Sequence, residues 1–365
     1  MKKGISILII ILMLLISTTT VMATDDALDI EKVAIQSIKN SEVVQSINRQ
    51  VTQAQENYAD ISAMMNGLRG SLRYQNSYQT VEAIILQPLI FENMLNQAYN
   101  RQIVVTNTVR LSSYKAYTSL LKAKYAFTIQ QDLMKGLDAD YKKAQLQLTM
   151  GMVSESQLRL SEIAYLKARY RYDSAQKGSN SASMSVNYMM GEEIWKQYST
   201  LQDNNITPAA QLNPLKDYVN IALGARAEII NAQGTLELKK KQYEYGKAEV
   251  PTDYQFYIQQ QEYAIDSAQN DLELAIINVQ LDITNLYKVL EASMKNMEAT
   301  KYLHDLAKLD YQRVEIQYEN SQISLQEFND AKVVKTQADI NYKNAELDAW
   351  LMQTTMDSAC GIGYK

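Results

Sequence analysis

Apolar residues in the second half of the chain are spaced as they are in long amphipathic helices. From Pro251 to about Asn320 the sequence contains no further proline and no glycine, and apolar side chains recur every three or four residues. This spacing is typical of a coiled-coil seam. The seam positions are Ile265, Ala268, Leu272, Ala275, Val279, Ile283, Leu286, Leu290, Met294 and Met297.

The first half of the chain has a matching stretch. From Pro88 to about Met150 its only glycine is Gly136, and it contains no further proline. A second helix of about 60 residues is therefore predicted, with a length of about 90 Å. Some apolar residues of the second-half helix lie off its seam, which favours a bundle or wall of helices over a two-stranded rod. These residues are Leu274, Ile276, Ile277 and Leu281.

The two halves repeat one another. The segment "YENSQISLQEFNDAKVVKTQADINYKNAE", residues 318–346, aligns without a gap on "LTMGMVSESQLRLSEIAYLKARYRYDSAQ", residues 148–176. An internal match of this kind predicts tandem structural repeats. Matches at the same offset continue outside the segment at Ala98/Ala268, Val109/Val279, Tyr117/Tyr287, Asp140/Asp310 and Gly191/Gly361.

The repeats and their connection can be bounded from this alignment. We place the first repeat at residues 24–191, a linker at residues 192–217 and the second repeat at residues 218–365. Farther upstream, "IKNSEVV" around Asn40 resembles "GARAEII" around Arg226 at a larger offset. The first repeat therefore has about 16 extra residues, between roughly residues 58 and 88.

Each repeat contains a sharp turn followed by a helix start. Ser154 with Gln157, and Ser324 with Glu327, form S-x-x-Q and S-x-x-E capping boxes. A capped helix that begins directly after a long helix must return antiparallel to it. The predicted hairpin tips comprise Gly151, Met152 and Ser154 in the first repeat and Ser321, Gln322 and Ser324 in the second.

Composition narrows the class of protein further. The 12 glycines and 4 prolines in 365 residues leave few turn formers, as expected for long helices. The net charge of -5 provides no basic field for nucleic acid. A secretory signal peptide is predicted at residues 1–23, "MKKGISILIIILMLLISTTTVMA", because they combine two lysines, an apolar run and a small residue at Ala23, the expected cleavage site. The alternative is an uncleaved membrane anchor. Outside that segment the sole cysteine, Cys360, cannot form an intramolecular disulfide.

The chain lacks the sequence patterns of catalytic and cofactor sites. His304 is the only histidine and falls on a predicted long helix, where a packing position is expected. Cys360 has no histidine nearby in the sequence to act as its base. There is no phosphate-binding loop, C-x-x-C or H-E-x-x-H motif. We therefore expect neither enzymatic activity nor a metal or other cofactor.

Several segments together resemble the TolC-type family of outer-membrane efflux proteins. The segment "LQPLIFENMLNQA", residues 86–98, resembles that family's entry into its first long helix. "TMGMVSESQL" and "ENSQISLQEFNDA" resemble its two hairpin tips, and "GARAEII" resembles its second-repeat Arg-Pro-Glu/Asp step with Ala227 in place of the proline. The resemblance implies a mainly all-α fold in which two tandem repeats of long antiparallel coiled-coil hairpins form an α-barrel or bundle.

The resemblance also implies partners and a site. The family forms homotrimeric helical tunnels whose tips dock on a membrane-fusion adaptor of an inner-membrane pump, such as an ABC transporter. An acidic pair after the second tip faces the narrow end of the tunnel, and here the matching residues are Glu327 and Asp330. Three copies would form an acidic constriction that binds cations. The alternative is structural, with Glu327 completing the capping box and Asp330 stabilising the positive end of the helix.

The sequence departs from the family in its membrane-spanning strands. The family has a strand hairpin in each repeat, whereas this chain offers at most one short vestigial β-hairpin, at about residues 66–87. Insertion into an outer membrane is therefore in doubt. The leading interpretation is an exported, non-enzymatic efflux or secretion conduit of the cell envelope, in the outer membrane if the cell has one. The alternative is an extracytoplasmic coiled-coil scaffold or spacer that has lost channel function.

Overall fold

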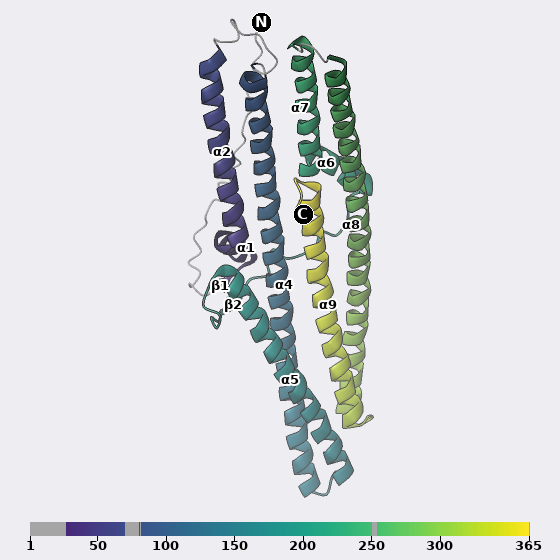
Figure 1. Cartoon of the computed structure of the whole chain (residues 1–365). Helices are drawn as coiled ribbons and strands as arrows, with labels where there is room; N and C mark the ends of the chain where they lie inside the picture. Colours follow the sequence, from purple (N-terminus) through teal and green to yellow (C-terminus); the bar gives the residue numbers. More distant parts are fainter. Residues whose placement is uncertain (1–26, 70–79, 81, 250–253, 365) are drawn as a thin grey trace.

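The structure, a computed structural model, describes residues 27–69, 80, 82–249 and 254–364 (Figure 1). The described part is mostly helical and contains two short strands. Its elements are β1 (Ala27–Leu28), α1 (Ile30–Asn40), α2 (Glu42–Leu68), the π-helix η2 (Glu82–Leu86), α4 (Gln87–Thr149), α5 (Glu155–Met190), β2 (Thr200–Leu201), α6 (Leu215–Ala225), α7 (Ala227–Glu249), α8 (Tyr254–Glu319) and α9 (Leu325–Cys360).

The two predicted long helices are confirmed as α4 and α8. They contain 63 and 66 residues, which corresponds to lengths of about 95 and 99 Å. Pro88 lies in the first turn of α4, where its missing N–H removes no intrahelical bond. Along α8 the predicted seam is buried at several positions, whereas the off-seam residues Leu274, Ile277 and Leu281 are exposed. The buried seam residues are Ala268, Val279, Ile283, Leu290 and Met294.

The long helices lie side by side and form a wall, on which the short helices α1 and α6 pack. α2 and α5 pack against α4, and α7 and α9 also pack against α4. α8 in turn packs against α7 and α9 (Figure 1). In the upper half the order across the wall is α2, α4, α7, α8 (Figure 1). In the lower half α5 crosses α4, and its start near the tip lies close to α9. α8 therefore lies at one edge, and α2 with the later part of α5 lies at the other.

Short elements at mid-height hold each repeat together. β1 and β2 form a parallel pair, and the hydroxyl of Tyr117 on α4 donates to Leu28 O at 2.7 Å or to Gln202 O at 2.8 Å. In the second repeat the buried Arg226, between α6 and α7, donates to Asp282 Oδ2 at 3.0 Å and to Ala359 O at 3.1 Å. Arg226 thereby joins the α6–α7 corner to α8 and to the end of α9.

The two corners make equivalent contacts, except that the glycine of the second repeat lies two residues later than the alignment places it. Asn40 and Arg226, aligned in sequence, each pack against a glycine that follows the last helix of their repeat. Asn40 packs on Gly191, where a Cβ would lie 2.6 Å from its side chain. Arg226 packs on Gly363, two residues beyond the Gly361 that the fixed offset pairs with Gly191.

Some predictions concern residues outside the described part. The signal peptide, residues 1–23, lies there entirely, as do residues 70–79 and 81 at the centre of the vestigial β-hairpin. The described flanks of that hairpin are helical, in α2 and η2. No helix in the described ranges is both long and apolar enough to cross a membrane.

Candidate functional site

The first hairpin tip is a helix stop followed directly by a helix start. Gly151 N–H donates to Leu148 O at 2.9 Å and Met152 N–H donates to Gln147 O at 2.8 Å, the two bonds of a Schellman motif. Gly151 has a φ of 71°, a left-handed conformation that glycine adopts without steric cost. The tip therefore closes α4 with its last carbonyl groups satisfied.

The predicted capping box then starts α5. Ser154 N–H donates to Gln157 Oε1 at 2.8 Å, and Gln157 N–H donates to Ser154 Oγ at 3.3 Å. The same reciprocal pair is present at the second tip, where Ser324 N–H donates to Glu327 Oε2 at 2.8 Å and Glu327 N–H donates to Ser324 Oγ at 3.2 Å. Both predicted capping boxes are confirmed.

The second tip has the same turn, with Ser321 in place of glycine at the left-handed position. Ser321 N–H donates to Tyr318 O and Gln322 N–H donates to Gln317 O, both at 2.9 Å. Ser321 has a φ of 56° and is the only non-glycine residue with positive φ in the described ranges. A Cβ in this conformation is sterically unfavourable. Serine at this position therefore stores a small strain that the first tip avoids.

The two tips present different surfaces. Met150 and Met152 at the first tip are each 68% exposed, beside the exposed Leu146. At the second tip the exposed residues are polar and include Ser321 and Gln322. The first tip therefore ends in flexible thioether side chains of the kind that pack adaptably at binding surfaces.

Contacts across the hairpins join the second tip to α4. Lys332 on α9 forms an ion pair with Asp140 on α4 at 2.7 Å, and its ammonium lies 4.3 Å from the centre of the Phe328 ring. Lys143 on α4 lies over the ring of Tyr318 at 5.8 Å. The Lys332–Asp140 pair is mostly buried, so solvent screens it less than a surface pair.

The proposed acidic pair occupies two different environments. Glu327 is held in the capping box, and the backbone hydrogen bond from Ser324 lowers the pKa of its carboxyl below the usual range. Asp330, one turn later on α9, is exposed and lines a cleft between the hairpins. The structure of one subunit therefore shows the helix-capping role of Glu327. The acidic constriction requires several subunits and stays a prediction.

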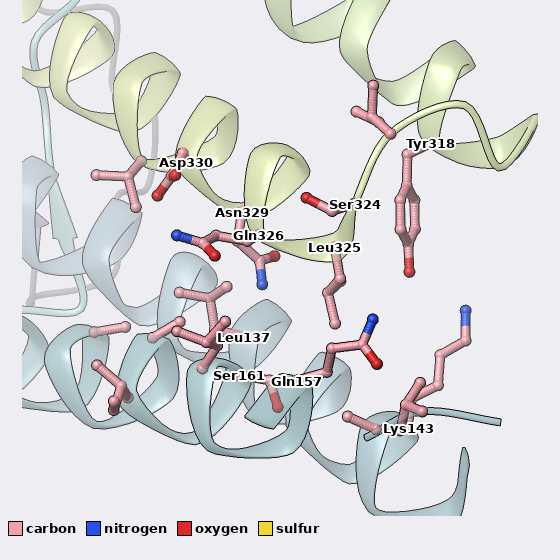
Figure 2. A pocket seen from close by; sticks show the side chains of 18 of the residues that line it. Leu137, Lys143, Gln157, Ser161, Tyr318, Ser324, Leu325, Gln326, Asn329 and Asp330 are labelled. Carbon is pink, nitrogen blue, oxygen red and sulfur yellow. The ribbon is translucent and has the colours of Figure 1, made fainter. Parts of the chain in front are cut away.

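The cleft lies between α5 and the α8–α9 tip, above the end of α4 (Figure 2). Its volume is about 740 Å³, within the usual range of ligand sites. Figure 2 shows Leu325, Gln326 and Asn329 of α9 facing Gln157 and Ser161 of α5 across this space. The cleft thus brings together the two tips that the sequence predicted separately.

Sequence reasoning missed the residues that join the hairpins. Asp140 was noted only as the repeat partner of Asp310, yet Asp140 pairs with Lys332, while Asp310 pairs with Arg313 on its own helix. Asn329 follows the buried Phe328 and is itself buried, which a polar residue one position along a helix does not reveal from sequence alone. Long-range pairs of this kind depend on how the hairpins pack.

The candidate reactive side chains have packing roles. His304 lies between Asp339 Oδ1 at 3.0 Å from Nε2 and Asp305 Oδ1 at 3.1 Å from Nδ1, and so links α8 to α9. Cys360 is buried, and burial raises the pKa of its thiol to about 11, which disfavours the nucleophilic thiolate. Within the described ranges, no cluster of three or more histidine, cysteine or acidic side chains is placed to hold a metal ion.

Comparison with known proteins gives matches at the level of structure. No protein-family model matches the chain, and no curated protein matches it in sequence. The outer-membrane channel OprN superposes with a TM-score of 0.68 at 10% identity, over 92% of this chain and 90% of OprN. The chain has the fold of TolC-type outer-membrane channels. CusC, known from structures that follow transmembrane channel formation, gives 0.67 at 12% identity over 92% of both chains.

The match to this channel fold extends over most of the chain. VceC, an outer-membrane protein from the pathogen Vibrio cholerae, gives a TM-score of 0.66 at 10% identity, over 92% of this chain and 97% of VceC. The fold expected from the tip and helix-entry motifs is therefore confirmed. At such low identity the likeness establishes the fold, and function has to be argued from the chain itself.

Proposed function

We propose that this protein is a subunit of an exported, non-enzymatic conduit in the cell envelope. Three copies form a helical tunnel, and their tips dock on a membrane-fusion adaptor of an inner-membrane pump. The observation that carries the proposal is the open wall of long helices, with apolar side chains exposed at both edges. The fold shared with outer-membrane channels supports it.

The two edges of the wall are suited to join one another. On α8 the exposed large apolar residues include Leu274, Ile277 and Leu281, and on α5 they include Leu166 and Tyr188. Large apolar residues exposed together along a helix edge are typical of interaction surfaces. Because the edges belong to different helices, edge-to-edge contact is heterologous, and repetition about an axis closes a ring. The number three comes from the resemblance to the TolC-type family.

The tips provide the docking end of the proposed tunnel. Both tips lie at the same end of the wall (Figure 1), and each is a rigid turn closed by a Schellman motif and a capping box. In a ring, Glu327 and Asp330 from each subunit form the narrow acidic end. The passage itself requires no reactive group, which agrees with the packing roles of His304 and Cys360.

The assembly is tested by charging one edge. We expect the mature chain to behave as a trimer in light scattering, and Ile277→Glu with Leu281→Glu to dissociate it while its helical content is retained. Gln280→Glu is the matched control, since it adds a charge at an exposed position of α8 without removing an apolar side chain. A well-behaved wild-type monomer at micromolar concentration would refute the proposed tunnel.

Conduction separates the tunnel from a scaffold. A trimer that supports ion conductance in a reconstituted assembly with adaptor and pump agrees with the conduit. A trimer that assembles but conducts nothing favours the alternative of an extracytoplasmic spacer.

A further inference from the structure

The cleft between the hairpins combines apolar and cationic lining. Its apolar lining includes Leu137, Leu160, Ala164, Ala168 and Val333, several of which pack in one small cluster. Its cationic lining consists of Lys143, Lys167 and Arg171. A site that joins an apolar surface to a few charged groups is typical of small-molecule recognition.

The cationic groups are available to a ligand. Lys167 and Arg171 are four residues apart on α5 and therefore project from the same side of that helix. Within the described part of the chain, neither of them forms an ion pair. Lys143, by contrast, already lies over the ring of Tyr318. The N-termini of α5 and α9 border the cleft as well and contribute partial positive charge.

A buried polar side chain also points to a ligand. Asn329 is only 4% exposed, lines the cleft, and its amide oxygen has no hydrogen-bond partner. Figure 2 shows its side chain directed into the space between α9 and α5. A buried amide without a partner is destabilising. Because the terminal amide can rotate by half a turn, the same position presents an N–H donor to an anionic oxygen.

We propose that this cleft binds an amphipathic organic anion with the chemistry of a fatty-acid carboxylate. The hydrocarbon chain lies along the apolar residues of α4, α5 and α9, and the carboxylate lies near Lys167 and Arg171. Asn329 donates to the ligand's oxygen. Two acidic residues, Glu319 and Asp330, also line the cleft, and their repulsion of the carboxylate limits the affinity.

Binding is measured by calorimetry on the purified full chain without detergent. The probe is laurate below its micelle concentration, compared with dodecylamine, which has the same chain and the opposite charge, and with acetate, which has the carboxylate alone. We expect laurate to saturate one site per chain, dodecylamine to bind at least tenfold more weakly, and acetate to show no binding. Equal binding of laurate and dodecylamine would refute recognition of the anion.

Variants locate the site. Lys167→Gln with Arg171→Gln is expected to weaken laurate binding about tenfold, the effect of two partly exposed ion pairs. The matched control is Arg169→Gln with Lys177→Gln, which removes the same charge from α5 at residues outside the cleft lining. The control variant is expected to bind as the wild type does. Equal weakening in both pairs would show a general charge effect and overturn the assignment.

Two further variants act from the opposite wall. Asp330→Asn is expected to tighten laurate binding about threefold, because it removes one repelling charge. Asn329→Leu, of similar size, is expected to weaken it about threefold, while circular dichroism confirms folding. Affinity that is unchanged or lower in Asp330→Asn would contradict the placement of the carboxylate. These measurements use the isolated protein, so their outcome is independent of the proposed conduit.

Discussion

Arg226 is predicted to be the most sensitive single position at the mid-height corner of the second repeat. Its side chain is 4% exposed and donates to Glu228, to Asp282 and to the carbonyl of Ala359. Arg226→Met fills similar volume but leaves both carboxylates without their cation and the carbonyl without a donor. The resulting loss of stability can be worked from these contacts.

Breaking a fully buried ion pair costs about 3–5 kcal/mol. Here the partners keep some water, since the side chains of Asp282 and Glu228 are 25% and 41% exposed, so the charge contribution is reduced to about 2 kcal/mol. The unpaired carbonyl of Ala359 adds about 1 kcal/mol. We therefore expect Arg226→Met to lower the free energy of unfolding by about 3 kcal/mol.

The assay is urea unfolding followed by circular dichroism, with two accompanying variants. Adding Glu228→Gln to Arg226→Met should recover part of this loss, because it removes a carboxylate that Arg226 neutralises in the wild type. Arg313→Met removes an exposed arginine paired with Asp310 and should change stability by less than about 0.5 kcal/mol. A loss below about 1 kcal/mol in Arg226→Met, or strict additivity in the double variant, would show that the corner does not depend on these bonds.

Three further predictions concern the second tip. Ser321→Gly relieves the strain at φ 56° and should raise the free energy of unfolding by about 0.5 kcal/mol in the same urea assay. The reason is that the left-handed penalty of about 1 kcal/mol exceeds the chain entropy that glycine adds to the unfolded state. A lower free energy of unfolding than that of the wild type would show that the turn is unstrained. The hydrogen bond from Ser324 N–H lowers the pKa of Glu327 from 4.5, so its stabilisation is present above that pH and lost as pH falls below it. The difference in melting temperature between wild type and Glu327→Gln should therefore change between pH 6 and pH 3, whereas Gln157→Ala, at the cap that does not titrate, should give the same difference at both. Glu327→Gln with Asp330→Asn should alter the cation sensitivity of conductance in a reconstituted assembly with little change in thermal stability, and unchanged sensitivity would leave the acidic pair with a structural role only.

The sequence by itself determined the elements whose causes are local. The absence of proline and glycine between Pro251 and Asn320, with apolar residues at helical spacing, predicted α8 closely. The capping boxes at Ser154 and Ser324 depend on residues three positions apart, and both formed as predicted. Backbone hydrogen bonds and caps join near neighbours, so a short window of sequence contains their partners.

Tertiary structure alone decided how the hairpins meet. The Lys332–Asp140 ion pair joins residues far apart in the sequence. The cleft that Asn329 lines is formed where the tip of the second hairpin packs against α4 and α5 of the first. The repeat alignment pairs Asp140 with Asp310 as equivalent positions, and their ion-pair partners differ. It also pairs Gly191 with Gly361, whereas the glycine that packs against Arg226 is Gly363. An internal repeat in the sequence predicts which features the two hairpins share, such as their turns and caps. It does not predict the contacts between the hairpins, because the facing surfaces of the two copies carry different side chains.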